Sequence, residues 1–250
     1  MSQAGTSLMA MSAPMVAFAG YSTKVSMDFE SSMSNVQAVS GATGKDLEAL
    51  TEKAKEMGAS TSKSATESAD AMYYMSLAGW DTTQILSGIE PVLKLSEAGN
   101  IDLARASDLC TDSMSAMGIQ VNDLGRYLDI VAQTQAKANT SADNLMQAYI
   151  GVGGTLNNLN VPLEESASLL GVLANRGIKG SEAGNALSSI LINLTSGLGQ
   201  AGGALEELNV SAYDSEGNFK GVEQTLLELN SALADCTQEQ RDSYLAMIGG

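Results

Sequence analysis

The feature that most constrains the fold is an apolar pattern with the period of an α-helix, which runs through nearly the whole chain. Residues at spacings of three and four lie on one face of a helix and are buried together. We therefore predict an all-α protein of short stacked helices, with at most one small β-hairpin near Tyr213–Phe219, where turn residues separate two aromatic ones. The clearest apolar stripes are Ala183, Leu187, Ile190, Leu191, Leu194 and Leu198; Leu103, Ala106, Cys110, Met114 and Met117; and Leu145, Ala148, Val152, Leu156 and Leu159.

Signals for helix starts and stops divide this pattern into segments. A glycine or asparagine followed by an apolar residue is typical of a helix end, where a left-handed residue precedes a hydrophobic one. Ser64-x-x-Glu67 has the spacing of a capping box at a helix start, with weaker versions from Asp81 and from Thr237. Pro91 is expected to kink or split its helix. The stop signals are Gly79-Trp80, Gly99-Asn100-Ile101, Gly118-Ile119, Asn160-Val161, Gly177-Ile178 and Asn209-Val210. The predicted helices cover residues 5–38, 44–57, 64–78, 83–98, 102–117, 122–138, 141–158, 162–176, 181–196, 204–208, 222–235 and 238–248.

Composition suggests where the chain divides. Ser196–Ala204 is rich in Ala, Gly and Ser and separates a main helical block from a smaller C-terminal piece. We predict an N-terminal helix over residues 1–40 that continues a longer upstream helix, a helical core over 41–200, and a smaller, truncated helical piece over 201–250. Leu8–Gly20 is apolar over only 13 residues and lacks a basic flank. We interpret it as the end of an amphipathic helix, not as a signal peptide or membrane span.

Charge and residue usage exclude several kinds of chemistry. The 250-residue chain has no histidine, so Ser–His–Asp and Cys–His catalysis cannot be built from it, and metal sites lose their commonest nitrogen ligand. Its 13 Lys and Arg against 29 Asp and Glu give a net charge of −16. Such a chain offers no basic surface to phosphate backbones and repels anionic lipids, so we expect no direct nucleic-acid partner and no membrane contact from this segment. Cys110 and Cys236 lack the spacing of a zinc or redox motif, and we expect both to be unpaired.

Two local patterns resemble ligand sites but lack the required spacing. Gly151-Val152-Gly153-Gly154 has no G-x-G-x-x-G, no following Lys–Ser/Thr and no preceding strand, so it indicates a kinked helix or a close helix contact. Asp214, Glu216 and Asn218 alternate as calcium ligands do. However, the glycine follows too early, and Thr225 stands where the calcium loop needs a glutamate. We interpret this second segment as a plain turn.

Small residues and paired carboxylates also have simple structural interpretations. Gly180, Gly184 and Ser188 are four apart on one predicted helix face and favour close packing of helices. Glu164–Glu165 and Glu206–Glu207 suit solvated helix faces or helix N-termini, where the helix dipole favours negative charge. Neither pair lies in an apolar segment that would separate two pKa values. We therefore predict that the protein is not an enzyme and has no catalytic, cofactor-binding or metal-binding residues and no cofactor.

Several motifs follow one another from Phe29 to the end of the chain. They are Phe29-Glu30-x-x-Met33-x-x-Val36, Val39–Gly44, Leu47–Gly58, Ser64–Gly79, Pro91–Leu95, Asp102–Ala104, Met114–Ile119, Ala174–Gly184, Leu208–Val210 and Tyr213–Phe219. The ordered set resembles the core domain of phage tail tape measure proteins of the TP901 type, and Ala174–Gly184 is its most specific string. The long coiled-coil, repeat and membrane-crossing regions of that family are missing here. The chain thus looks like one domain, or a fragment, of a much longer protein.

The resemblance implies a structural role in a phage or prophage tail. Proteins of this family lie extended in the lumen of the tail tube, and their length sets the tail length. They assemble in the host cytoplasm with tail chaperones and tail-tip or baseplate proteins, tail tube protein polymerises around them, and they leave ahead of the genome. Self-association of the full-length protein is compatible with this role. The alternative that the residues leave open is a helical partner-binding domain of a bacterial secreted or surface protein.

Overall fold

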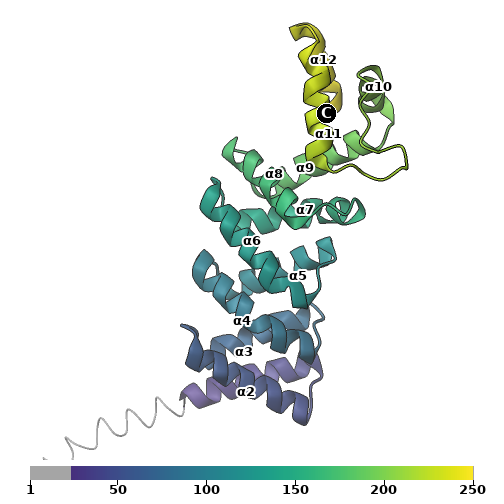
Figure 1. Cartoon of the computed structure of the whole chain (residues 1–250). Helices are drawn as coiled ribbons and strands as arrows, with labels where there is room; N and C mark the ends of the chain where they lie inside the picture. The colour runs from purple at the N-terminus through teal and green to yellow at the C-terminus, as the bar shows by residue number, and fades with distance from the viewer. Residues whose placement is uncertain (1–23, 250) are drawn as a thin grey trace, which may run out of the picture. The chain divides into compact units, whose positions relative to one another are not determined.

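Helices make up nearly all the regular structure in residues 24–249, the part of the chain that this computed structural model describes (Figure 1). Within that part, the β structure is an isolated antiparallel bridge between Tyr213 and Phe219, so the all-α prediction is confirmed. Residues 5–23 of the first predicted helix, including Leu8–Gly20, lie outside the described residues. The described helices are residues 24–40, α2 (Lys45–Ser60), α3 (Ala65–Leu77), α4 (Thr82–Gly99), α5 (Leu103–Met117), the 3₁₀ helix η1 (Val121–Asp123), α6 (Leu124–Lys137), α7 (Ala142–Asn158), α8 (Leu163–Asn175), α9 (Gly180–Thr195), α10 (Gly199–Glu207), α11 (Val222–Ala234) and α12 (Gln238–Gly249).

All six predicted stop signals end helices with the same hydrogen-bond pattern. At each, a glycine or asparagine has a positive φ between 48° and 93°. The N–H of the following apolar residue donates to the carbonyl five residues earlier, at 2.9 to 3.1 Å. This is the Schellman arrangement, which satisfies a carbonyl that the helix itself leaves unpaired. The donors are Trp80, Ile101, Ile119, Val161, Ile178 and Val210.

The helix starts follow the predicted side chains as well. Ser64 and Asp81 each form a complete capping box with the residue three positions later, and the N–H of Thr237 donates to the side chain of Gln240 at 3.0 Å. Pro91 lies inside α4, which continues unbroken through it. The carbonyl that loses its helical donor belongs to Ser87, which is an exposed residue. The prediction that Pro91 splits this helix is therefore wrong.

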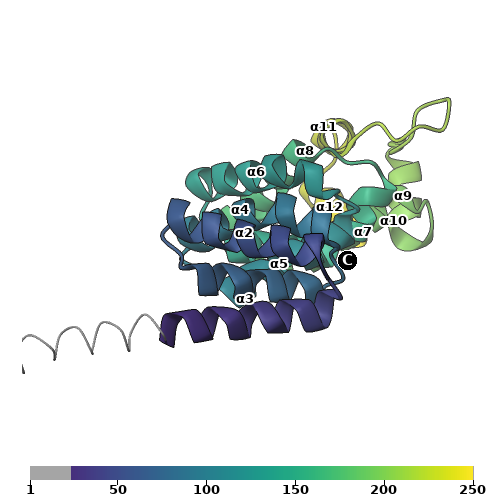
Figure 2. The same cartoon turned by 90° about the horizontal axis from the view of Figure 1, so that it is seen from below.

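The chain divides into two compact units, Met1–Asp108 and Leu109–Gly250. In the first unit, α2 packs against both α3 and α4 (Figure 2). Trp80, at the end of α3, lies against Gly88 of α4, where an added Cβ would come within 3.0 Å of the indole ring. The division into residues 1–40, 41–200 and 201–250 rests on composition and stays a prediction. The largest fully buried side chains of this unit are Leu50, Met57, Met72, Met75, Ile85, Ile89 and Leu93.

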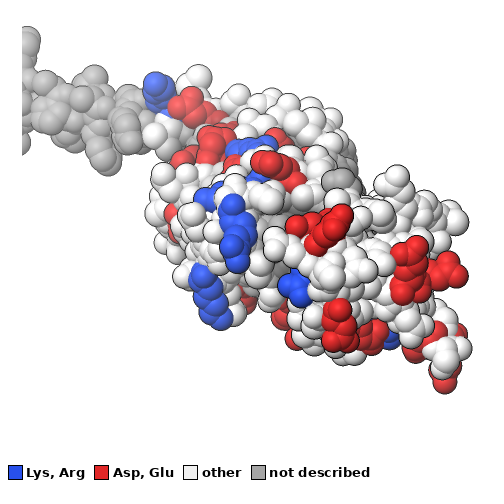
Figure 3. Space-filling model, turned by 90° about the horizontal axis from the view of Figure 1, so that it is seen from above, with Lys and Arg blue, Asp and Glu red and all other residues white. Residues whose placement is uncertain are grey.

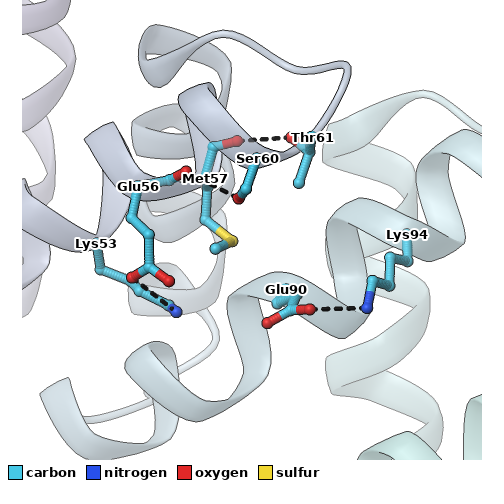
Figure 4. A network of polar contacts seen from close by, with 7 residues as sticks. All are labelled: Lys53, Glu56, Met57, Ser60, Thr61, Glu90 and Lys94. Carbon is cyan, nitrogen blue, oxygen red and sulfur yellow. Dashed lines mark hydrogen bonds and ion pairs between the residues drawn. The ribbon is translucent and has the colours of Figure 1, made fainter.

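Ion pairs lie on the surfaces of α2 and α4 and contribute little to the stability of this unit. Lys53 pairs with Glu56 at 3.0 Å, and Lys94 pairs with Glu90 at 2.7 Å (Figure 4). The hydrogen bond from Lys94, helped by its charge, holds the pKa of Glu90 below its ordinary value. Exposed pairs of this spacing are each worth about 0.3–0.5 kcal/mol. The apolar core therefore supplies most of the stability of the unit.

In the second unit, small residues let α7 and α9 approach closely. A Cβ at Gly184 would lie 3.0 Å from the backbone Cα of Ala148, and closer still to its carbonyl oxygen. The hydroxyls of Thr155 and Ser188 are 2.9 Å apart across the same pair of helices. The close packing predicted for the face of Gly184 and Ser188 is thus confirmed. Because Gly184 has no side chain, the backbone of α9 lies in close contact with the backbone of α7.

Two predictions for the C-terminal part of the chain are wrong. Leu198 lies beyond the end of α9 and is 76% exposed, because Gly197 and Gly199 both take positive φ and turn the chain. Helix α10 also begins at Gly199, five residues before its predicted start, because Ala201 and Gly202 are buried and extend the apolar face of the helix N-terminally. The C-terminal helices share a core with the end of α9, and this core comprises Leu194, Ala204, Leu205, Val210, Leu229, Leu233 and Ile248.

Candidate interaction surface

The two motifs that resembled ligand sites are parts of ordinary backbone structure. Gly151–Gly154 lies inside α7. A Cβ at Gly153 would come within 2.8 Å of Ala116, so this glycine permits a close helix contact. Asp214 accepts hydrogen bonds from the backbone N–H groups of Glu216 and Asn218, both at 2.9 Å. These bonds hold the pKa of Asp214 below its ordinary value and use its carboxylate to shape a turn.

Buried polar groups of the second unit are held in its core. Burial raises the pKa of the Cys110 thiol and of the Tyr127 hydroxyl, and it raises that of Tyr149 to about 12. The Tyr149 hydroxyl lies 3.3 Å from Ser166 Oγ, and its ring meets that of Tyr127 edge to face at 5.6 Å. Among the residues that the structure describes, no group of His, Cys, Asp and Glu could hold a metal ion. Cys110, Tyr127 and Tyr149 are therefore protonated core side chains at neutral pH.

A groove lies beside α8 on the surface of the second unit. It has a volume of about 910 Å³ and runs between α8 and α11. Its apolar lining includes Val172, 60% exposed, and Leu227, 57% exposed. Side chains of this size bury favourably against a partner, since each buried CH₂ contributes about 0.8 kcal/mol. We call this feature, lined by Leu169 and Val172 of α8 and by Leu226 and Leu227 of α11, the α8–α11 groove.

Carboxylates line the end of the groove where both helices begin. Glu164 pairs with Arg126 of α6 at 2.6 Å, and its own backbone N–H together with that arginine holds its pKa below the ordinary value. Glu165 accepts a hydrogen bond at 2.8 Å from the backbone N–H of Glu223, in the first turn of α11. The paired acids Glu164 and Glu165 thus occupy the first turn of α8, as predicted, and Glu165 also ties α8 to α11.

The basic side chain in the groove lining, Lys220, already forms an ion pair. Lys220 forms an ion pair with Glu228 of α11. Hydrogen bonds from Lys220 and then from Gln224 hold the pKa of Glu228 below its ordinary value. Lys220 is the basic residue of the groove lining, against Glu164, Glu165 and Glu223. The groove therefore combines an apolar floor with net negative charge.

A second, smaller hollow lies on the other side of α8. It has a volume of about 370 Å³ and is lined by α6 and α8, including Glu164, Ser168 and Val172. These three residues also line the α8–α11 groove. The exposed ridge of α8 is therefore flanked by hollows on both sides. Figure 3 shows both acidic and basic side chains on the face that it draws.

Sequence reasoning missed the groove, although one signal for it is present. Leu226, Leu227, Leu229 and Leu233 cannot all share one narrow helix stripe. In the structure Leu229 and Leu233 are buried, while Leu227 faces outward. An excess of large apolar residues around a short helix thus indicates that some of them are exposed. Val172, which lines the groove opposite Leu227, lies on α8, far from α11 in the sequence.

Comparison with known proteins relates the chain to one protein family and to two curated proteins. A family model described as phage-related minor tail protein matches residues 51–250. The chain belongs to this phage-related minor tail protein family. It is 32% identical over 241 residues to the tape measure protein of Pneumococcus phage Dp-1, covering 96% of this chain and 21% of that protein. It is 27% identical over 207 residues to the probable tape measure protein of Escherichia phage P2, covering 82% of this chain and 25% of that protein.

The chain spans about a fifth to a quarter of the length of these curated relatives. No solved structure matches it. Within the described residues, no helix is long and apolar enough to cross a membrane. The family membership therefore rests on sequence similarity along nearly the whole chain.

Proposed function

We propose that this chain is a segment of a tape measure protein that sets tail length and takes part in tail assembly and genome ejection. The observation that carries the proposal is the 32% identity to a tape measure protein along 96% of the chain. The all-helical fold and the tight helix ends suit a structural component. The alternative, a helical domain of a secreted or surface protein, is not favoured by either relative.

The proposal includes location and partners. In the virion the chain lies in the lumen of the tail tube, and during assembly it is in the host cytoplasm. Its partners are the tail tube protein, tail chaperones and tail-tip or baseplate proteins, and it acts without catalysis. The exposed apolar residues beside α8 supply surface for such contacts. The net charge of −16 supports binding to proteins over direct binding to nucleic acid.

Tail length tests this proposal directly. In the phage or prophage that encodes the chain, an in-frame deletion of residues 24–249 should abolish tails of normal length, and electron microscopy measures the length distribution. A silent recoding of the same region is the matched control. Mass spectrometry of purified particles should also find peptides of this chain. Tails of unchanged length in the deletion strain, or virions without these peptides, would contradict the proposal.

A further inference from the structure

We propose that the α8–α11 groove is a docking site for an amphipathic helix with basic residues, supplied by another protein. The inference concerns the surface chemistry of this chain and does not rest on the proposed function. It combines three observations: exposed apolar side chains, two helices that leave a space between them, and more carboxylates than basic side chains in the lining of that space.

The apolar part of the site is exposed where a helical partner would bury it. Val172 and Leu227 are 60% and 57% exposed, and both line the groove with the half-buried Leu169 and Leu226. These side chains come from two helices that face the same hollow. Amphipathic helices bind proteins by laying apolar residues at i, i+3, i+4 and i+7 into grooves of this kind.

The length of the groove suits a helix. On α8 the lining extends from Glu164 to Val172, and on α11 it extends from Glu223 to Asn230. These stretches of nine and eight residues each correspond to a little over two helical turns. A third helix can therefore place two turns of side chains between α8 and α11, as the helices of a small bundle do.

The negative charge of the groove favours a basic partner helix. Glu165 and Glu223 lie together at the start of α11, while Lys220 is paired with Glu228. A basic side chain near the end of the incoming helix would meet these carboxylates, and an acidic one would be repelled. Among the described helices, α6 alone has more basic than acidic residues, and its Arg126 is engaged with Glu164. A second copy of this chain is thus a poor match, and a different protein is favoured.

A yeast-displayed library of amphipathic helical peptides, randomised at the apolar and flanking positions, is the probe. Selection against the purified chain should enrich peptides with an apolar i, i+3, i+4, i+7 face and net positive charge. The enriched peptides are then synthesised and titrated by fluorescence anisotropy. The double variant Val172→Gln/Leu227→Gln should weaken their binding about tenfold or more, because both apolar contacts are lost.

Two further variants separate the parts of the proposal. Ile192→Gln changes a residue of α9 that is 51% exposed and lies outside the groove, so binding should be unchanged. Glu223→Gln removes a groove carboxylate and should weaken binding roughly two- to fivefold at low salt, with a smaller effect at high salt. Circular dichroism spectra that match the parent confirm that each variant is folded.

Four outcomes would overturn the proposal. The enriched peptides could be acidic or could bind the double variant as tightly as the parent. The selection could enrich no peptide above the level seen with the double variant. Sedimentation equilibrium could instead show self-association of the parent chain that Val172→Gln/Leu227→Gln abolishes, which would assign the groove to a second copy.

Discussion

Gly184 is the residue at which one added methyl group has the sharpest expected effect. Gly184→Ala places a Cβ against the backbone of Ala148, and such overpacking costs about 1–3 kcal/mol. Because the contact is with backbone atoms, which cannot move aside as a flexible side chain can, we expect this cost to exceed the gain of about 1 kcal/mol in helix propensity. We expect a lower urea midpoint by far-UV circular dichroism. The matched control is Gly154→Ala in α7, where a Cβ meets nothing within 4 Å, and its midpoint should rise. Equal shifts for both variants would contradict the close packing of α7 and α9.

The two cysteines should differ in reactivity while the protein is folded. Both are unpaired, with Cys110 buried and Cys236 partly exposed. Because burial hides the Cys110 thiol and raises its pKa, a thiol reagent should label Cys236 quickly and Cys110 only on unfolding. Two thiols per chain should react in denaturant. Loss of the fast phase in Cys110→Ser, with its retention in Cys236→Ser, would refute this assignment.

At the scale of a helix end, Asn160 tests the repeated Schellman pattern. It has a φ of 51°, a left-handed conformation that costs a residue with a Cβ about 1–2 kcal/mol, although asparagine tolerates it well. We expect Asn160→Ala to lower the free energy of unfolding by about 1 kcal/mol and Asn160→Gly to preserve or raise it. Asn158→Ala, at the exposed last residue of α7, is the control and should change little. The prediction fails if Ala and Gly at position 160 behave alike.

The capping box of α3 predicts a pH dependence. The backbone N–H of Ser64, as the main cause, lowers the pKa of Glu67 below its ordinary 4.5. The unfolded chain thus binds the proton more readily, so the stabilisation is fully present above about pH 4.5 and is lost as the pH falls through the lowered value. Glu67→Gln should lose less stability between pH 5 and 3 than the parent, measured by urea unfolding. Glu52→Gln, at an exposed site on α2, should follow the parent curve.

Most helices were predictable because their signals are local. The apolar period, the capping box at Ser64 and the Gly or Asn stops all act within one or two turns, and the structure confirms them. The place of the α8–α11 groove was not predictable, because the groove depends on two helices that α9 and α10 separate along the chain and that leave a space between them. The early start of α10 was missed for a related reason. Its glycines read as a linker, and only burial of Ala201 and Gly202 stabilises them as helix.

For the whole molecule, the division into two units predicts separable unfolding. Trp80, the single tryptophan, lies in the first unit against Gly88. Gly184→Ala, which acts in the second unit, should shift the midpoint seen by circular dichroism and leave the midpoint seen by tryptophan fluorescence unchanged. Gly88→Ala is the converse control and should shift the fluorescence midpoint. Equal shifts of both signals in Gly184→Ala would show that the two units unfold as one.

The pairing of helices close in sequence has a consequence for how the chain acquires its structure. Helix α7 packs against α6, α8 and α9, and α2 packs against α3 and α4, so most partners are first or second neighbours along the chain. Proteins with such low contact order fold quickly. Each helix can therefore find its partners soon after it leaves the ribosome, before the helices that follow it have been made. The core that needs α12 is the exception, and it must wait until the last of these helices has been synthesised.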